Sequence, residues 1–147
     1  MIRLALGYPD REEEMAVIGG AASFGAEEGL SAVCTKEELL AAMDEADRCK
    51  AYKAVCGYIA DIAAATRKHA GIKLGLSTRG AAALKRMSCA LAAIDGRDCV
   101  MPQDVQKAAP YVIPHRLVYR GFTKEEVKLE ILRQIIESVT VPTELAG

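Results

Sequence analysis

Apolar residues recur along most of the chain at steps of three and four, the spacing that gathers them on one side of an α-helix. The clearest case is the Ala-rich segment 80–95, which Gly96 would end. Its apolar stripe consists of Leu84, Met87, Leu91 and Ile94. This pattern predicts a long amphipathic helix in the middle of the chain.

Five further segments show the same spacing. One of them begins at Pro102 and stops before Pro110. In the other four, the expected inward-facing residues are Met15 and Ile18 after an Asp10 cap; Leu39, Met43 and Ala46; Val55, Ile59, Ile62 and Thr66, in a helix running to about Ala70; and Val127, Ile131, Ile135 and Val139. No two segments show convincing strand pairing, although residues 49–52 can form a short extended piece. The chain is therefore predicted to be all-α, a compact bundle of about six helices.

Capping signals support two of these helix starts. Thr35 with Glu38, and Thr123 with Glu126, have the capping-box spacing, in which the Thr hydroxyl and the Glu carboxylate each accept from a backbone amide. Phe122 would then pack on the first turn of the last helix as a hydrophobic staple. Both helices should begin directly after their Thr.

Length and composition indicate one domain over residues 1–147, because a chain of this size buries about two-thirds of its unfolded surface in one core. Small residues predict a flexible loop at about 19–34, and we expect a loose tail at about 140–147. Nineteen Lys and Arg residues against twenty Asp and Glu give a net charge of −1. This balance argues against a generally basic nucleic-acid-binding protein.

Cysteine usage and hydropathy point to the cytoplasm. The five cysteines are odd in number and contain no C-x-x-C pair, which favours reduced thiols. No run of about twenty apolar residues could cross a bilayer, and the start of the chain lacks the hydrophobic core of a signal peptide. We expect a soluble protein with no membrane partner.

Candidate chemistry lies at the start of the Ala-rich helix. Ser77 can cap it, and Arg79 then falls in the first turn, where unpaired amides and the helix dipole make a partly positive end. A cation there is locally unfavourable by about 0.3 to 1 kcal/mol. The placement makes sense if guanidinium and helix N-terminus act on the same phosphate oxygens. The alternative is that Arg79 is a solvated first-turn residue.

The charge distribution favours the phosphate interpretation. Residues 62–94 contain no Asp or Glu. The cations in this span are Arg67, Lys68, Lys73, Arg79, Lys85 and Arg86, together with His69. A basic region therefore surrounds the candidate anion site.

Several other chemistries have no supporting motif. The sequence has no G-x-x-x-x-G-K-[ST] to cradle a triphosphate and no acidic pair after an apolar strand to hold Mg²⁺. His69 and His115 lack ligand spacing, so we expect no metal site. No Ser, Cys or Thr lies in a nucleophile motif. The isolated chain is not expected to catalyse a reaction.

An ordered set of motifs, covering nearly the whole chain, resembles the C-terminal helical lid of MoxR-type AAA+ ATPases. Each motif alone is weak, but six in this order are specific. They are Leu6-Gly7-Tyr8-Pro9 with the acidic residues 12–14; Tyr58-Ile59 with Ala65-Thr66-Arg67; Leu74 to Arg79; Gly96-Arg97-Asp98 with Val100, Pro102, Asp104 and Val105; His115-Arg116-Leu117; and Val141-Pro142.

The resemblance implies a missing catalytic half. In such enzymes an α/β domain upstream carries the P-loop and the Walker B acid, and ATP with Mg²⁺ lies between that domain and the lid. Arg79 falls at the sensor 2 position, from which an Arg reaches the γ-phosphate. ATP and Mg²⁺ would thus belong to the parent enzyme, and this chain alone would bind neither.

The resemblance also implies partners and further contacts. The parent would form a homo-oligomeric ring, a hexamer, that matures or remodels other complexes in a chaperone-like role. Von Willebrand factor A domain proteins are common partners of the family. Tyr8 and Pro9 would pack near the adenine, unless they form a helix-entry turn that serves only the fold. We interpret Arg67, Arg97 and Arg116 as structural residues.

Some positions depart from the family pattern. Thr78 stands where Pro is usual, which loosens the helix start without removing Arg79. Met101 replaces a Ser or Thr cap. Cys49 and Ala51 replace a Val-rich strand, so we do not expect a lid strand there.

Three other functions stay open at this point. The chain can be the lid of a magnesium-chelatase-type AAA+ subunit, or a stand-alone helical module that binds another protein through an apolar groove. A nucleic-acid module using residues 67–86 is a third possibility, against which the net charge and the absence of aromatic residues in that span both argue.

Overall fold

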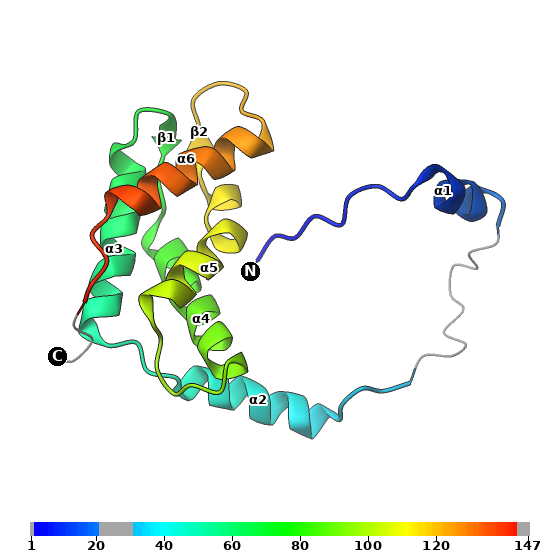
Figure 1. Cartoon of the computed structure of the whole chain (residues 1–147), viewed down its shortest axis with the longest axis horizontal. Coiled ribbons are helices and arrows are strands. Elements are labelled where there is room, and N and C mark those ends of the chain that lie inside the picture. The colour runs from blue at the N-terminus through cyan, green and yellow to red at the C-terminus, as the bar shows by residue number, and fades with distance from the viewer. Residues whose placement is uncertain (1, 21–30, 144–147) are drawn as a thin grey trace.

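The computed structural model of the chain describes residues 2–20 and 31–143. The elements follow in the order α1 (Arg11–Ile18), α2 (Lys36–Arg48), α3 (Lys53–Lys68), β1 (Ile72–Leu74), α4 (Thr78–Ile94), α5 (Pro102–Val112), η1 (Pro114–Arg116, a 3-10 turn), β2 (Val118–Tyr119) and α6 (Glu125–Ser138). Figure 1 shows α3 to α6 gathered in one body, from which α2 and α1 extend. The prediction of a mostly helical lid-type fold with six helices is confirmed.

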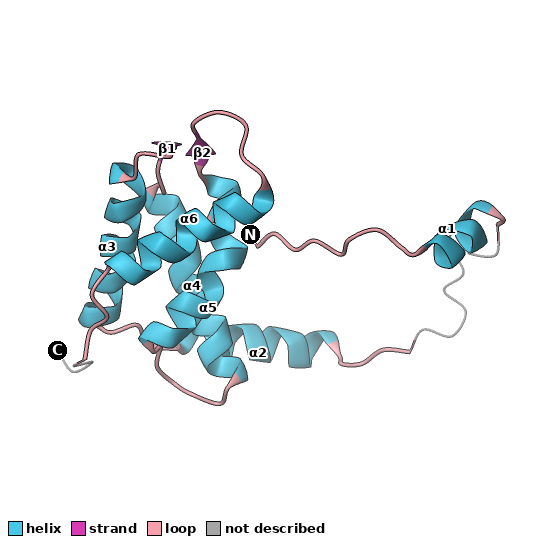
Figure 2. Ribbon diagram, turned by 45° about the horizontal axis from the view of Figure 1, so that its top comes forward, coloured by secondary structure: helices cyan, strands magenta, loops and turns pink. Residues whose placement is uncertain are grey.

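The core lies between α3, α4, α5 and α6 (Figure 2). All four predicted positions of α3 are buried, and Val55 and Ile62 have no exposed surface at all. Leu76, Leu84 and Leu132 fill the same core from the connecting segment, α4 and α6. The periodicity of α3 therefore predicted both the helix and its buried face.

The buried face of α4 differs from the predicted stripe. Leu84 is fully buried and Met87 and Leu91 are partly buried, but Ile94 is 79% exposed. The buried residues are Gly80, Ala83, Leu84, Ser88, Cys89 and Ala92. Mostly small residues face the core because α2, α3 and α5 all pack on this helix and approach it closely.

The helices α1 and α2 form where predicted, but they do not bury the predicted residues. Both begin with a complete capping box, at Asp10 and at Thr35. Met15 is 55% exposed and Ile18 is 79% exposed, and α1 lies apart from the other helices (Figure 1).

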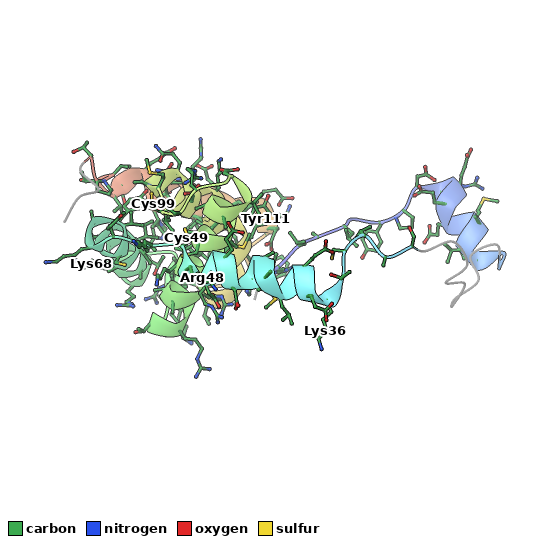
Figure 3. The ribbon with its side chains drawn as sticks, turned by 90° about the horizontal axis from the view of Figure 1, so that it is seen from below. Lys36, Arg48, Cys49, Lys68, Cys99 and Tyr111 are labelled. Carbon is green, nitrogen blue, oxygen red and sulfur yellow. The ribbon has the colours of Figure 1, made fainter. Side chains whose placement is uncertain are left out.

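Only part of α2 reaches the body. Leu39 and Met43 are more than half exposed, and Ala46 is partly buried. Figure 3 shows α2 projecting from the body, with Arg48 near it and Lys36 at the far end. An apolar stripe marks a face that can be buried, and no described residue covers most of it in α2.

Two short strands pair where none was predicted. Ile72–Leu74 and Val118–Tyr119 form an antiparallel ladder, which joins the α3–α4 connection to the segment before α6. The extended piece at residues 49–52 is confirmed only as one parallel bridge between Lys50 and Cys99, beside the labelled Cys49 in Figure 3. Strands this short leave no alternating pattern to recognise.

The predicted end of the fifth helix is wrong, because α5 continues through Pro110 to Val112. An interior proline removes its own amide donor and crowds the carbonyl four residues earlier, which disfavours a helix without forbidding it. The ladder resumes beyond it, where Ile113 N–H donates to Ala109 O at 2.9 Å. Pro114 then starts the 3-10 turn.

The capping box predicted at Thr123 is also wrong. The helix begins at Glu125, with Lys124 as the N-cap residue and no side-chain cap. The Thr123 hydroxyl donates to Gly121 O at 3.4 Å instead, and Phe122 is 99% exposed rather than packed as a staple. Gly121 takes a positive φ of 75°, a turn that directs Thr123 away from the helix.

Two predictions fall largely on residues outside the described ranges. The flexible loop at about 19–34 includes residues 21–30, and the loose tail at about 140–147 includes residues 144–147. Both stay predictions. Within residues 2–20 and 31–143, no helix is long and apolar enough to cross a membrane.

Candidate functional site

The first turn of α4 has the geometry predicted from its sequence. Ser77 is in the extended region, with φ −74° and ψ 162°, and its Oγ accepts from Gly80 N–H at 3.2 Å. Ala81 N–H donates to Ser77 O at 2.9 Å, the first hydrogen bond of the helix. Ser77 is therefore the N-cap, and Thr78 and Arg79 are the first two helical residues.

Arg79 is exposed at this helix start. Among the described residues it has no hydrogen-bond or ion-pair partner, and the first turn of α4 contains no acidic residue. A guanidinium beside unpaired helix amides can act with them on one anion. The local geometry fits a phosphate-binding role.

The segment that leads into α4 is held by the end of α3. Thr66 is fully buried, and its Oγ1 accepts from Leu76 N–H at 2.9 Å and donates to Ala63 O at 2.6 Å. Arg67 Nε donates to Leu76 O at 3.0 Å. Both backbone groups of Leu76 are thus paired with consecutive residues of α3.

Two glycines make close approaches at the same place. A Cβ on Gly75 would lie 2.6 Å from Arg67 Cγ and 2.7 Å from Arg67 Cα, so only glycine fits between the connection and α3. A Cβ on Gly80 would lie 2.5 Å from Leu76 Cδ1 and 3.5 Å from Arg116 Cδ. Arg67 and Arg116 therefore both pack against the start of α4.

The basic region predicted from the sequence is exposed. Arg67, Lys68, Lys73, Arg79, Lys85 and Arg86 all have exposed side chains. None of them takes part in an ion pair with a described residue. Cations exposed together without ion-pair partners among the described residues favour an anionic ligand.

Tyr8 and Pro9 lie elsewhere. They immediately precede α1, far from α4 in Figure 1, and Tyr8 is 98% exposed. Ser77 and Arg79 lie together at the start of α4, and Tyr8 and Pro9 do not lie beside them. Their adenine contact stays a prediction that needs another domain to complete it.

The interpretation of Arg97 as a structural residue is confirmed; Arg97 lies just beyond the C-terminal end of α4. Its Nη1 and Nη2 donate to the two carboxylate oxygens of Asp104, each at 2.7 Å, and Nη2 also donates to Asp95 at 2.9 Å. Asp104 is 1% exposed and accepts from Met101 N–H at 2.8 Å. This carboxylate, rather than a Met101 side chain, caps α5.

The pKa of Asp104 reflects this pairing. Burial alone would raise it, but the hydrogen bonds from Arg97 and Met101 and the Arg97 charge outweigh burial, so the pKa lies below its ordinary value. Its hydrogen bonds to Asp104 and Asp95 raise the pKa of Arg97. Both groups stay ionised at neutral pH, and the pair ties the α4–α5 connection together.

Sequence reasoning missed the contacts that Thr66 and Arg67 make with Leu76. The Thr66-Arg67 pair is visible in the sequence, and so is Gly75, which marks a close backbone approach. Their partner Leu76 is ten residues from Thr66 and nine from Arg67, across a turn, and no spacing rule indicates that distance. Within the described ranges, no group of His, Cys, Asp and Glu could hold a metal ion.

Comparisons with known proteins identify relatives of the chain. Residues 64–135 match the AAA lid domain family. The chain is 34% identical over 146 residues to the uncharacterized protein YeaC of Bacillus subtilis, covering 98% of this chain and 46% of YeaC. It is 28% identical over 155 residues to Chaperone MoxR1 of Mycobacterium tuberculosis, covering 97% of this chain and 40% of that protein.

A solved structure shares the fold. A crystal structure from Cytophaga hutchinsonii, provisionally assigned as an ATPase, matches with a TM-score of 0.75 at 23% identity, covering 97% of this chain and 47% of that one. The chain thus spans less than half the length of each relative. Residues 64–135 therefore belong to the AAA lid domains, and the relation to a MoxR protein, with the shared fold, supports the lid of a MoxR-like AAA+ ATPase.

Proposed function

We propose that this chain is the lid that closes over ATP and Mg²⁺ bound to a P-loop domain of the same protein, with Arg79 contacting the γ-phosphate. The observation that carries the proposal is Arg79 in the first turn of a Ser-capped helix, exposed, without a partner among the described residues and surrounded by cations. Arg79 and the first-turn amides of α4 that precede Gly80 would attract the same oxygens. Ser77 serves by holding that helix start.

Closure would couple hydrolysis to movement. While the γ-phosphate is present, charge-assisted hydrogen bonds from Arg79 hold the lid against the P-loop domain. When the phosphate leaves, that attraction is lost and the lid can rotate. In a ring of identical subunits, a hexamer by our proposal, each lid would pass this rotation to its neighbour.

The family relation supports the wider role. One relative is named a chaperone, and we propose a similar cytoplasmic function, the maturation of other protein complexes. A von Willebrand factor A domain protein is our candidate partner. Tyr8 and Pro9 would complete the adenine side of the site once the P-loop domain is in place.

The decisive experiment replaces Arg79 with Ala in the full-length protein and measures steady-state ATP hydrolysis. A lost charge-assisted hydrogen bond of about 1.5 to 3 kcal/mol corresponds to a kcat about ten- to a hundredfold lower. Lys85→Ala is the matched control, because it removes one exposed cation from the same helix beyond its first turn. Unchanged turnover in Arg79→Ala, or an equal loss in Lys85→Ala, would overturn the proposal.

A native-size measurement distinguishes the interaction-module alternative. An antibody raised against the chain is used to probe an extract of the source cells. A species far heavier than 15.7 kDa supports a lid within a complete ATPase, and a species at 15.7 kDa supports a separate helical module.

A further inference from the structure

We infer that Arg67 is a positioning residue for Arg79: by holding the backbone of Leu76, it fixes where α4 begins and thereby where the Arg79 guanidinium meets the phosphate. This inference rests on the proposed function. It assigns Arg67 a role in turnover, beyond a general contribution to the fold.

The contact is specific to one backbone group. Arg67 Nε donates to Leu76 O at 3.0 Å, while Leu76 N–H is already paired with Thr66 at 2.9 Å. Leu76 itself has no exposed surface, so its side chain is fixed in the core. With side chain, N–H and C=O all held, Leu76 is a rigid point directly before the helix.

Arg79 is only three residues from this point. Ser77 Oγ accepts from Gly80 N–H at 3.2 Å and Ser77 O accepts from Ala81 N–H at 2.9 Å, so two hydrogen bonds tie the residue after Leu76 to the first turn that carries Arg79. Before Leu76 in the chain, the backbone of Gly75 lies directly against Arg67, which restricts its movement. A change in the Leu76 carbonyl direction would therefore rotate the first turn and carry Arg79 with it. Displacements of about 1 Å at a catalytic group can cost about a hundredfold in rate.

Burial separates the roles of the two α3 residues. Thr66 has no exposed surface, and loss of its hydroxyl would leave the buried Leu76 amide unpaired, which costs general stability. Arg67 is an exposed residue that also lies against Gly75, so its replacement should affect the direction of α4 more than the free energy of unfolding. Arg67 is therefore the better residue for the test.

A direct contact between Arg67 and the nucleotide is the competing explanation, because Arg67 belongs to the same basic region. Charge and geometry can be separated. Arg67→Met keeps an aliphatic chain beside Gly75 but removes both charge and donor. Arg67→Lys keeps the charge but has a methylene at the Nε position, so the contact with Leu76 O is lost in its present geometry.

The experiment is a double-mutant cycle on ATP turnover in the full-length protein, with Arg67→Met, Arg79→Ala and the two combined. We expect Arg67→Met to lower kcat about tenfold with the nucleotide KM little changed, and to have no further effect when Arg79 is already Ala. Arg67→Lys should behave like Arg67→Met. Hydrogen exchange should increase at residues 77–80 in both Arg67 variants and stay unchanged in α5.

Each other outcome would overturn the inference. An unchanged kcat in Arg67→Met, a further loss in the Arg79→Ala background, or normal turnover in Arg67→Lys would show that Arg67 does not act through Arg79. If Arg67→Met does not fold, Arg67→Lys with the exchange measurement decides. Failure of the proposed function is recognised separately, because Arg79→Ala alone would then leave turnover unchanged.

Discussion

The two ends of α4 each carry an arginine, and their surroundings are opposite. At the C-terminal end, Arg97 makes two 2.7 Å hydrogen bonds to Asp104 and one to Asp95. At the N-terminal end, Arg79 has no partner within the described part of the chain. The helix dipole favours a cation such as Arg97 near the C-terminal end and disfavours a cation such as Arg79 at the N-terminal end.

This contrast distinguishes an arginine used by the fold from one available to a ligand. Arg97 satisfies a buried carboxylate, and that carboxylate caps α5. Arg79 pairs with no residue in the described ranges and adds positive charge where helix amides are already positive. An arginine at an unfavourable helix N-terminus, without a role in the fold, is better explained by an anion that comes from another domain or a ligand.

The largest expected effect is the loss of Arg97. Arg97→Met should lower the free energy of unfolding by about 3 kcal/mol, because it leaves the buried Asp104 carboxylate without its charged partner. Urea denaturation monitored by circular dichroism measures the change. Arg79→Ala is the matched comparison and should change the free energy of unfolding by less than about 0.5 kcal/mol. Equal decreases in the free energy of unfolding of the two variants would mean that both arginines stabilise the fold to the same extent.

Lowering the pH should reduce the difference in free energy of unfolding between wild type and Arg97→Met. The pKa of Asp104 is lower in the folded chain than in the unfolded one, where it is near 3.9. Its stabilising contribution is therefore complete above about pH 4 and is lost as the pH falls through the folded value. In Arg97→Met, burial without the partner should favour the protonated acid instead.

The measurement is the free energy of unfolding of both proteins between pH 7 and pH 3. The exposed carboxylates Glu38, Glu125 and Glu130, whose pKa values are also lowered, are common to both proteins and cancel in the difference. A difference that stays constant down to pH 3 would mean that Asp104 does not depend on Arg97.

The smallest expected effect tests the cap at the Arg79 end. Ser77→Ala should cost about 1 kcal/mol, because Gly80 N–H loses its acceptor, whereas Ser77→Gly should cost only a few tenths. Thr78→Ala, at the neighbouring exposed position, is the control and should be nearly neutral. Thermal unfolding of the three variants gives the order. If Ser77→Ala is neutral, the start of α4 is held by Leu76 alone.

Much of the fold follows from short-range rules. Val55, Ile59 and Ile62 predicted the buried face of α3, and the capping signals at Asp10 and Thr35 predicted the starts of α1 and α2. Gly96 ends α4 with a positive φ of 72°, as its sequence indicates. These features depend on residues three or four apart, which helix geometry brings together in any context.

The wrong predictions depend on longer distances. Ile94, Met15 and Leu39 lie at positions with helical apolar spacing but are exposed, because burial needs a second surface that periodicity does not provide. The pairing of β1 with β2 joins segments more than forty residues apart.

For the candidate site, the sequence by itself determined the Ser77 cap, the place of Arg79 in the first turn and the acid-free span around it. These are local properties of the chain and of helix termini. Only the tertiary structure decided that Arg79 has no partner among residues 2–20 and 31–143, that Thr66 and Arg67 hold Leu76, and that Arg97 is bound to Asp104. The reason is physical: hydrogen bonds across turns depend on how whole helices pack, and packing sums weak contacts over the entire core.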